Sequence, residues 1–253
     1  MLHDDDPLRS PSGEVTSEAT SSPSVRATRR EQDKVGVDER RLREEIGFYS
    51  HLLVDLGLLE FKGGNLSVRI DDDMLITKRS VAKAIPSPDD IVRTSIFQED
   101  EGAYEASSAM EIHRAIYKAT DARAVIHAHP SKTVSLSLFL DELVPLEENG
   151  LLYLRPKVSV VAPPTLFGWN LAADEMADCL RTEKVVVQKW HGTFAKGVDL
   201  SEAFHRTRAV EFMSAHLIRI AELREHFGEP TLPPTEMAPV IGGIPGRGLK
   251  KME

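Results

Sequence analysis

The chain has 253 residues, of which 41% are hydrophobic and 28% charged, a composition typical of globular proteins. Its formal net charge of −9 disfavours general nucleic-acid binding, which depends on basic contacts to phosphate. The one cysteine, Cys179, excludes an intrachain disulfide, and every apolar stretch is shorter than a bilayer span. The N-terminus lacks the basic and apolar regions of a secretory signal, so we expect a cytoplasmic protein that binds neither nucleic acid nor membrane.

Both ends of the chain are predicted to lie outside the folded domain. Residues 1–36 are rich in Ser, Thr, Pro and charged side chains and cannot bury enough apolar surface to offset their ordering entropy, which predicts a disordered tail. Residues 230–253 are rich in Pro and Gly and are predicted to be irregular. Residues 37–229 are therefore expected to form one domain.

The predicted elements mix helices with strands. The first helix starts near Asp38, because apolar residues recur at helical spacing from Leu42 to Leu56. Alternating or short apolar runs predict strands over 65–70, 74–77, 91–97, 124–129, 158–161 and 184–190. Further helices are predicted over 108–120, after Pro130, over 171–181 and over 200–227. This order favours a layered α/β domain whose mixed sheet is covered by helices on both faces.

A pair of histidines in one predicted strand is the most informative feature. His127 and His129 are two residues apart, so their side chains would leave the strand on the same face and could share one metal ion. His191, at the end of another apolar strand and next to Gly192, is the best candidate for a third ligand. An H-x-H pair can equally lie on a solvated face, and His191 can be a hydrogen-bonded core residue. The position of all three histidines at the ends of apolar strands favours a metal site, because the functional sites of α/β proteins usually lie at strand ends.

The start of the helix predicted over 108–120 carries a carboxylate and two hydroxyls. Ser108 and Glu111 fit the S-x-x-E capping box, in which Glu111 would simply cap its own helix. If Glu111 faces the metal instead, Ser107 and Ser108 would present hydroxyls and N–H groups to a phosphate. The Gly64–Asn65 turn could add a second anion-binding loop or be an ordinary turn.

Taken together, these segments resemble the class II aldolase/adducin family, and within it the L-fuculose-1-phosphate aldolases. The resemblance covers roughly residues 40–220. Four segments carry it, in this order: Gly64 to Arg69; Ser107 and Ser108 with Glu111 and His113; Val125 to Pro130; and His191–Gly192 with Gly197 and Glu202–Ala203.

The resemblance implies a three-layer α/β/α domain with a central, mixed and largely antiparallel sheet. It implies one Zn²⁺ per subunit on three histidines, a homotetramer with active sites at subunit interfaces, and a small phosphorylated sugar as substrate. The metal ligands implied are His127, His129 and His191, with Glu111 as catalytic acid/base and possible fourth ligand. The phosphate-binding residues implied are Gly64, Asn65, Thr77, Ser107 and Ser108.

Three departures from the family pattern concern the substrate. The loop after the second predicted strand reads Thr77-Lys78-Arg79-Ser80 in place of a Thr-Pro-Thr-Gly type, so Lys78 or Arg79 would pair with an anion or remain a solvated charge. No tyrosine aligns with the one that follows the histidine pair in fuculose-type enzymes. Trp190 stands where a polar residue is common.

The expected function is that of a zinc-dependent aldolase that cleaves or forms a ketose 1-phosphate through an ene-diolate, with dihydroxyacetone phosphate and an aldehyde as the other species. One alternative is a pentulose-phosphate epimerase or a decarboxylase that uses the same metal site. Another is a non-catalytic module such as the adducin head, which would have no need of converging histidines and a carboxylate.

Overall fold

The computed structural model describes residues 23–228, with side chains from residue 39 onward. The chain divides into two units, residues 1–39 and 40–253, and the sheet belongs to the second. Helix α1 (Pro23–Asp55) begins well before Asp38, so residues 23–36, assigned above to a disordered tail, are helical. The rest of that predicted tail, residues 1–22, and the predicted irregular end at 230–253 lie outside the described residues.

An eight-stranded sheet forms the centre of the second unit, in the order β3-β2-β1-β4-β8-β7-β6-β5. Among the strand pairs that the structure describes, only β6 and β7 are parallel, which confirms a mixed and largely antiparallel sheet. The strands are β1 (Asn65–Ile70), β2 (Asp73–Thr77), β3 (Ile91–Ser95), β4 (Ala124–Ala128), β5 (Glu142–Leu143), β6 (Val158–Val161), β7 (Val185–Gln188) and β8 (Gly192–Gly197).

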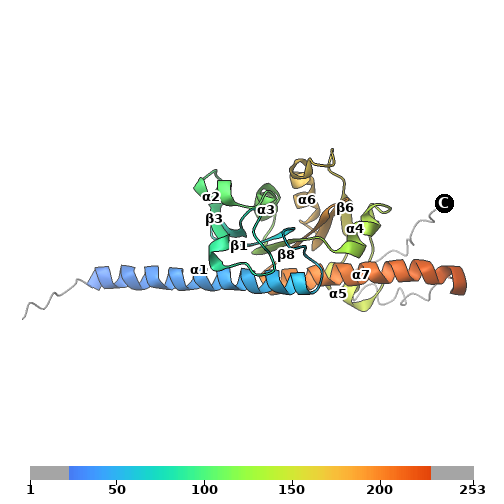
Figure 1. Cartoon of the computed structure of the whole chain (residues 1–253), viewed down its shortest axis with the longest axis horizontal. Helices are drawn as coiled ribbons and strands as arrows, with labels where there is room; N and C mark the ends of the chain where they lie inside the picture. The colour runs from blue at the N-terminus through green and yellow to red at the C-terminus, as the bar shows by residue number, and fades with distance from the viewer. Residues whose placement is uncertain (1–22, 229–253) are drawn as a thin grey trace, which may run out of the picture. The chain divides into compact units, whose positions relative to one another are not determined.

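Helices cover both faces of this sheet, which confirms the three-layer prediction (Figure 1). One face packs against α2 (Glu101–Glu105), α3 (Met110–Ala119) and α6 (Ala173–Cys179). The other packs against residues 40–55 of α1, α5 (Glu148–Leu154) and α7 (Leu200–Phe227), and α4 (Ser131–Ser137) lies against α7. Two 3-10 helices, η1 (Pro88–Asp90) and η2 (Trp169–Ala172), complete the elements.

The strands divide their apolar side chains between the two faces as the alternating pattern requires. In β7, Val186 packs with the α3 and α6 layer, whereas Val185 and Val187 pack with α5 and α7. In β8, Phe194 and Ala195 likewise belong to opposite faces. A one-residue slip would exchange the two sets, so burial on both faces fixes the register of the strands next to the histidines.

Besides the 3-10 helix η1, the sequence analysis missed two α-helices and two strands: α2, β5, α5 and β8. The first three are short, and β8 reads Gly-Thr-Phe-Ala-Lys-Gly, with little of the β-branched character that marks a strand. His191 follows the end of β7, as predicted, and lies in the tight turn that leads into β8. None of the helices within residues 23–228 has the length and apolar character needed to cross a membrane.

Candidate metal centre and adjoining cavity

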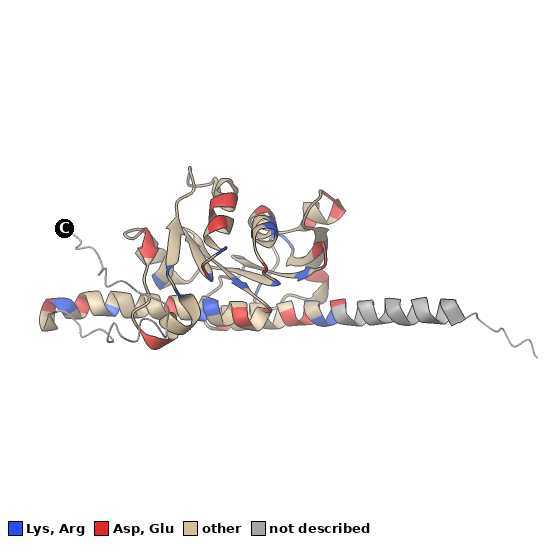
Figure 2. Cartoon of the chain, turned by 180° about the vertical axis from the view of Figure 1, so that it is seen from behind, with Lys and Arg blue, Asp and Glu red and all other residues tan. Residues whose placement is uncertain are grey.

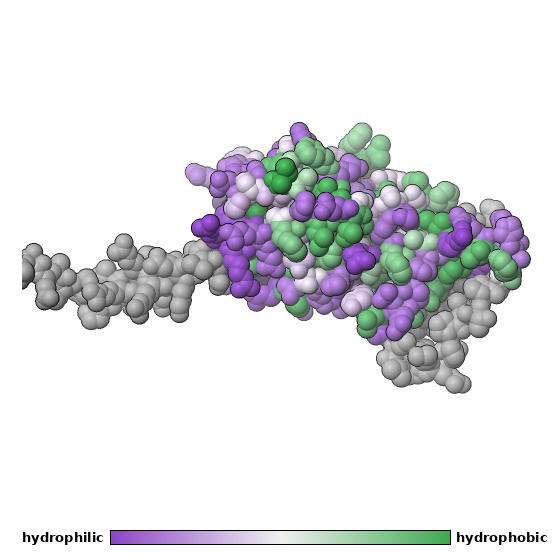
Figure 3. Space-filling model, turned by 60° about the horizontal axis from the view of Figure 1, so that its bottom comes forward, coloured by the Kyte–Doolittle hydropathy of each residue, from purple (hydrophilic) through white to green (hydrophobic). Residues whose placement is uncertain are grey.

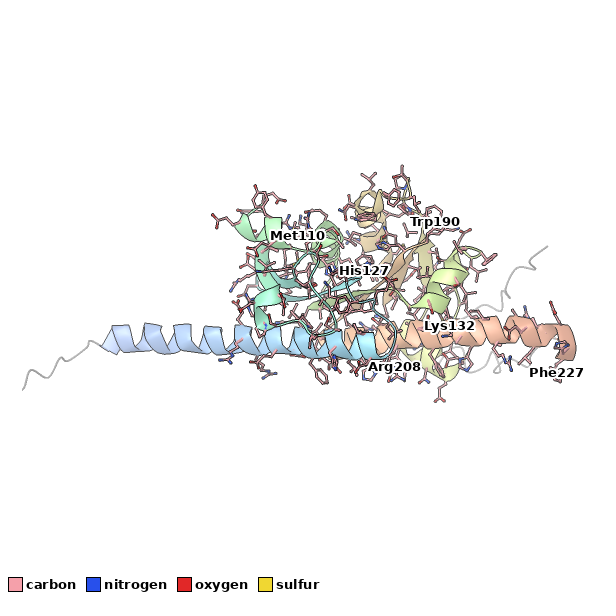
Figure 4. The ribbon with its side chains drawn as sticks, in the orientation of Figure 1. Met110, His127, Lys132, Trp190, Arg208 and Phe227 are labelled. Carbon is pink, nitrogen blue, oxygen red and sulfur yellow. The ribbon has the colours of Figure 1, made fainter. Side chains whose placement is uncertain are left out.

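Strand β4 brings the first two histidines to the middle of the domain. It pairs with β1 on one side and β8 on the other, so its backbone is held along its whole length. His127 is 2% exposed, and its ring stacks on that of Phe194 with the centroids 4.2 Å apart. His129 directly follows the strand, and its N–H donates to the carbonyl of Leu58 at 2.9 Å. Figure 4 shows His127 in the interior, between the labelled Met110 and Trp190.

The three histidines converge on a single point. One ligand nitrogen from each of His127, His129 and His191 lies within 4.8 Å of the others, and the ring centroids are 4.8–5.0 Å apart. The Nε2 atoms of His127 and His129 are 3.2 Å apart. Two nitrogens bound at about 2.0–2.1 Å to one tetrahedral ion would be about 3.3 Å apart. The cluster can therefore hold a metal ion with little movement.

In the His127 and His191 rings, hydrogen bonds to Nδ1 leave Nε2 free to bind a metal. Nδ1 of His127 lies 3.0 Å from the carbonyl oxygen of Thr193, which can only accept, so Nδ1 carries the proton and Nε2 keeps its lone pair. Nδ1 of His191 lies 2.7 Å from Oε1 of Gln188. The amide nitrogen of Gln188 donates to the carbonyl of Trp169 at 2.8 Å, so Oε1 must face His191. Such outer contacts orient metal-binding imidazoles.

Burial keeps the three imidazoles neutral at neutral pH. It lowers the pKa of His127 well below its usual value, and the neighbouring His129 and His191 add to the effect. Burial also lowers the pKa of His129, and it lowers that of His191 to about 4. A neutral imidazole is the form that binds a metal, so the cluster does not have to lose protons before binding.

Gly192 is required where the third ligand meets the first two. A Cβ atom at this position would lie 2.3 Å from the carbonyl oxygen of Ala128 and 2.7 Å from the His129 ring. Glycine thus allows β8 to run close to β4 at the site. The preceding residue, Trp190, has a positive φ of 68°, which turns the chain so that His191 enters the cluster.

A cavity of about 260 Å³ adjoins the cluster, a size that suits a small metabolite. All three histidines line it, together with Gly64, Asn65, Lys78, Ser107 and Ser108, which the sequence analysis had assigned to phosphate. Four cationic side chains and no carboxylate are among the described residues that line it; the cations are Lys62, Lys78, Arg79 and Lys83. Figure 2 shows the acidic residues along the helices that cover the sheet, so a net acidic chain keeps a cationic cavity.

A family profile described as the class II aldolase and adducin N-terminal domain matches residues 44–217. The chain belongs to the class II aldolase and adducin family. A 5-methylthioribulose-1-phosphate/5-deoxyribulose-1-phosphate aldolase from an Escherichia coli strain is 29% identical over 199 residues, which cover 77% of this chain and 90% of that protein. The crystal structure of an L-fuculose-1-phosphate aldolase from Thermus thermophilus is similar, with a TM-score of 0.68 and 33% identity over 76% of this chain and 99% of that one.

A decarboxylase is also among the relatives. The 3-oxo-tetronate 4-phosphate decarboxylase of Cupriavidus necator is 32% identical over 101 residues, which cover 40% of this chain and 46% of that protein. Family membership accounts for the sheet and the helices around it, but the relatives are named for different reactions.

Glu111 does not take the place in this class II aldolase fold that the sequence analysis gave it. Its side chain is 48% exposed and accepts a hydrogen bond from Arg114 at 2.9 Å. It is not among the residues that line the cavity, nor is it in the histidine cluster. The capping box is absent as well, because α3 begins after Ala109, which makes no side-chain cap. The α3 start presents the methyl group of Ala109 to the cavity.

Thr77 is also placed differently from the prediction. It is buried, its Oγ1 accepts the N–H of Leu66 at 3.4 Å, and it does not line the cavity. The two cations that follow Thr77 line the cavity. Lys78 pairs with Glu105 at 2.6 Å, and Arg79 is exposed. Ser80 has a positive φ of 61°, which bends this loop around the cavity.

A buried polar chain that the sequence analysis missed orients Asn65. His113 is fully buried, and burial lowers its pKa to about 3, so its ring is neutral. Its Nε2 lies 2.5 Å from Oδ1 of Asn65, which can only accept, so Nδ1 of His113 must accept from the Ser67 hydroxyl 2.7 Å away. Ser67 is in turn 2.7 Å from the Tyr117 hydroxyl, which is then its donor. The amide NH₂ of Asn65 is left to donate into the cavity.

Proposed function

We propose that this protein is a zinc-dependent lyase that cleaves or forms a carbon–carbon bond of a small ketose 1-phosphate, with dihydroxyacetone phosphate as one product. The observation that carries the proposal is the 3.2 Å approach of two histidine nitrogens, completed by His191, at the edge of a cationic cavity. The aldolases named among the relatives act on phosphorylated deoxy sugars of this kind.

The donor set favours zinc. Three neutral imidazoles, with no carboxylate in the cluster that the described residues form, are typical of a catalytic site that leaves one position for substrate. A divalent cation held there would supply Lewis-acid stabilisation of the negative charge of the ene-diolate. His127 and His191 are held for this role by Thr193 and Gln188.

The other cavity residues are proposed to bind the phosphate. Donors and positive charge line the cavity, from the amide of Asn65, the hydroxyls of Ser107 and Ser108, and the side chains of Lys78 and Arg79. Binding energy at this end would hold the carbonyl end of the substrate at the histidines. Glu111 has no part in this proposal, because its carboxylate does not line the cavity.

Decarboxylation of a phosphorylated 3-oxo acid is the second candidate. The absence of any carboxylate among the described lining residues favours it, because a substrate with both phosphate and carboxylate would meet only positive charge. Loss of carbon dioxide also needs no base to remove a hydroxyl proton. An epimerase or a non-catalytic module remains the outcome if neither reaction occurs.

The experiment is to load the purified protein with zinc and offer it a panel of ketose 1-phosphates and phosphorylated 3-oxo acids. Release of dihydroxyacetone phosphate, followed by a coupled reduction with NADH, would support the aldolase. Release of carbon dioxide would support the decarboxylase, and carbon-preserving interconversion the epimerase. No turnover by a protein that binds one zinc per chain would overturn the proposal.

We also infer a homotetramer whose active sites lie near subunit contacts. Exposed apolar side chains in the segments beside the cavity support an assembly: Phe167 is 78% exposed, Leu171 72% and Trp190 41%. Figure 3 shows further hydrophobic residues on the face of the molecule that this view brings forward. Light scattering should give four times the chain mass, and a monomer at micromolar concentration would contradict the inference.

A further inference from the structure

Lys83 is the most deeply buried cation of the cavity. Its side chain is among the largest of the fully buried ones, and the residue is 2% exposed. The backbone around it is fixed from two sides: its N–H donates to the carbonyl of Phe61 at 2.8 Å, and its carbonyl accepts from the Ser50 hydroxyl at 2.8 Å. Lys83 therefore lines the cavity from a rigid position, unlike the exposed Lys62.

The amine of Lys83 has few partners for so buried a charge. Its Nζ donates to the carbonyl of Val81 at 3.1 Å, and no ion pair of Lys83 is present among the described side chains. Lys78, by contrast, is paired with Glu105 at 2.6 Å. Burial lowers the pKa of Lys83 to about 8, and the charge of Asp90 opposes this in part. At neutral pH a fraction of Lys83 is thus a neutral amine.

The proposed reaction requires a group that can both accept and donate a proton. Among the described residues that line the cavity, the histidines are committed to the metal, and the serines, Asn65 and Trp169 have no proton affinity in this range. Lys62 and Arg79 are exposed to solvent, and Lys78 is paired with Glu105. Lys83 is therefore the remaining candidate for the proton-transfer group among the described residues that line the cavity.

We propose that Lys83 is the proton-transfer residue of this site. The neutral amine accepts the proton of the substrate hydroxyl whose oxygen becomes the aldehyde carbonyl. The electron pair of the breaking carbon–carbon bond moves to the ketone, which gives the ene-diolate. The ammonium then donates the same proton to the ene-diolate carbon, releases dihydroxyacetone phosphate and becomes neutral again. This role rests on the proposed lyase function and takes the place that a carboxylate would otherwise fill.

A half-reaction tests Lys83 without knowledge of the aldehyde. Dihydroxyacetone phosphate is incubated with the zinc-loaded protein in D₂O, and exchange of its hydroxymethyl C–H is followed by proton NMR. In Lys83→Met we expect the exchange rate and kcat to fall at least about 100-fold, the usual contribution of general acid–base catalysis, with KM changed far less. Zinc content and the thermal unfolding midpoint, measured on the same samples, should match the wild type.

Two matched variants separate proton transfer from simple charge. Lys83→Arg keeps the positive charge but cannot release a proton, so it should exchange as slowly as Lys83→Met. Lys62→Met removes a lysine from the same cavity, and it should raise KM while leaving kcat within about threefold, as expected of a group that only binds. Rapid exchange by Lys83→Arg would show that Lys83 only attracts phosphate and would overturn the proposal.

Rescue supplies a readout that a structural role would not give. Lys83→Ala should regain exchange when ethylamine is added, and rescue by several small amines should follow their pKa values. If the wild type cleaves ketose phosphates and the Lys83 variants do so at the same rate, the proposal for Lys83 is wrong and the lyase function stands. If the zinc-loaded wild type neither cleaves nor exchanges, the lyase function is wrong and the role of Lys83 is wrong with it.

Discussion

Nδ1 of His191 lies 2.7 Å from the side-chain oxygen of Gln188, three residues earlier in the same β-hairpin. Gln188 is fully buried, and its amide is fixed by the carbonyl of Trp169. A ligand from a turn is thus held as firmly as one from a strand, because the buried amide can bond in one orientation only.

Gln188→Leu should therefore weaken the metal site without removing a ligand. Loss of such an outer contact usually lowers metal affinity about 10- to 100-fold, because the imidazole is free to rotate. Titration of the metal-free protein with zinc against a competing chelator measures this. Gln98→Leu, at an exposed position on another loop, is the matched control, and equal affinities of the two variants would remove the orienting role of Gln188.

Glu111→Gln should leave catalysis nearly intact. Its carboxylate contacts Arg114, lies half in solvent and does not line the cavity, so we expect kcat to change by less than about threefold, as for surface changes that miss the transition state. His127→Ala, which removes a buried member of the cluster, should abolish zinc binding and turnover in parallel assays. A large loss of kcat in Glu111→Gln with normal zinc content would restore the carboxylate to the mechanism.

Gly192→Ala should damage the site by close contact. The added methyl carbon would lie 2.3 Å from the carbonyl oxygen of Ala128, so β8 must move away from β4. We expect the free energy of unfolding to fall by about 3 kcal/mol or more, the upper end for an overpacked interior. Urea unfolding measures this, and zinc affinity should fall as well. Gly47→Ala is the control, because its φ is not positive and the nearest atom to an added Cβ, the carbonyl oxygen of Pro86, lies 3.2 Å away, so it should lower the free energy of unfolding far less.

The buried His113 should make stability depend on pH. Its pKa is about 3 in the folded protein and 6.5 in the unfolded chain, so between these values the unfolded chain binds more protons. Its contribution is complete above pH 6.5 and is lost as the pH falls toward 3, at about 1.4 kcal/mol per pH unit. Urea unfolding of metal-free protein between pH 4 and 7 measures the slope.

The cluster histidines also have lowered pKa values and add to that slope, so the comparison needs a variant. His113→Gln keeps a donor for Asn65 but cannot titrate, and its slope should be smaller than that of the wild type by the contribution of one histidine. If the free energy of unfolding changed equally with pH in the variant and the wild type, His113 would have the same pKa in the folded and unfolded chains. His113→Leu, which removes the donor to Asn65, should raise KM, because the chain from Tyr117 to Asn65 would no longer orient the amide for phosphate.

Much of the fold followed from local pattern. Strands β1 and β6 were predicted with their observed bounds, and β2 and β4 to within one residue, because alternating or short apolar runs mark a strand. Strand β8 was missed, because its two glycines reflect tertiary contacts: Gly192 lies close to β4, and Gly197 lies close to the start of α7. The start of α1 was misplaced, because a polar sequence can be helical without an apolar face that marks where it begins.

The sequence by itself determined the pair of histidines, since a spacing of two in a strand puts both side chains on one side. It also determined the acidic overall charge and the order of the segments by which the family is recognised. Only the tertiary structure decided that Glu111 is outside the cavity and Lys83 inside it. Each residue of a helix is turned by about 100° from the last, so a start displaced by two residues points a carboxylate elsewhere. A loop lysine becomes a buried amine only when Phe61 and Ser50, distant in sequence, close around it.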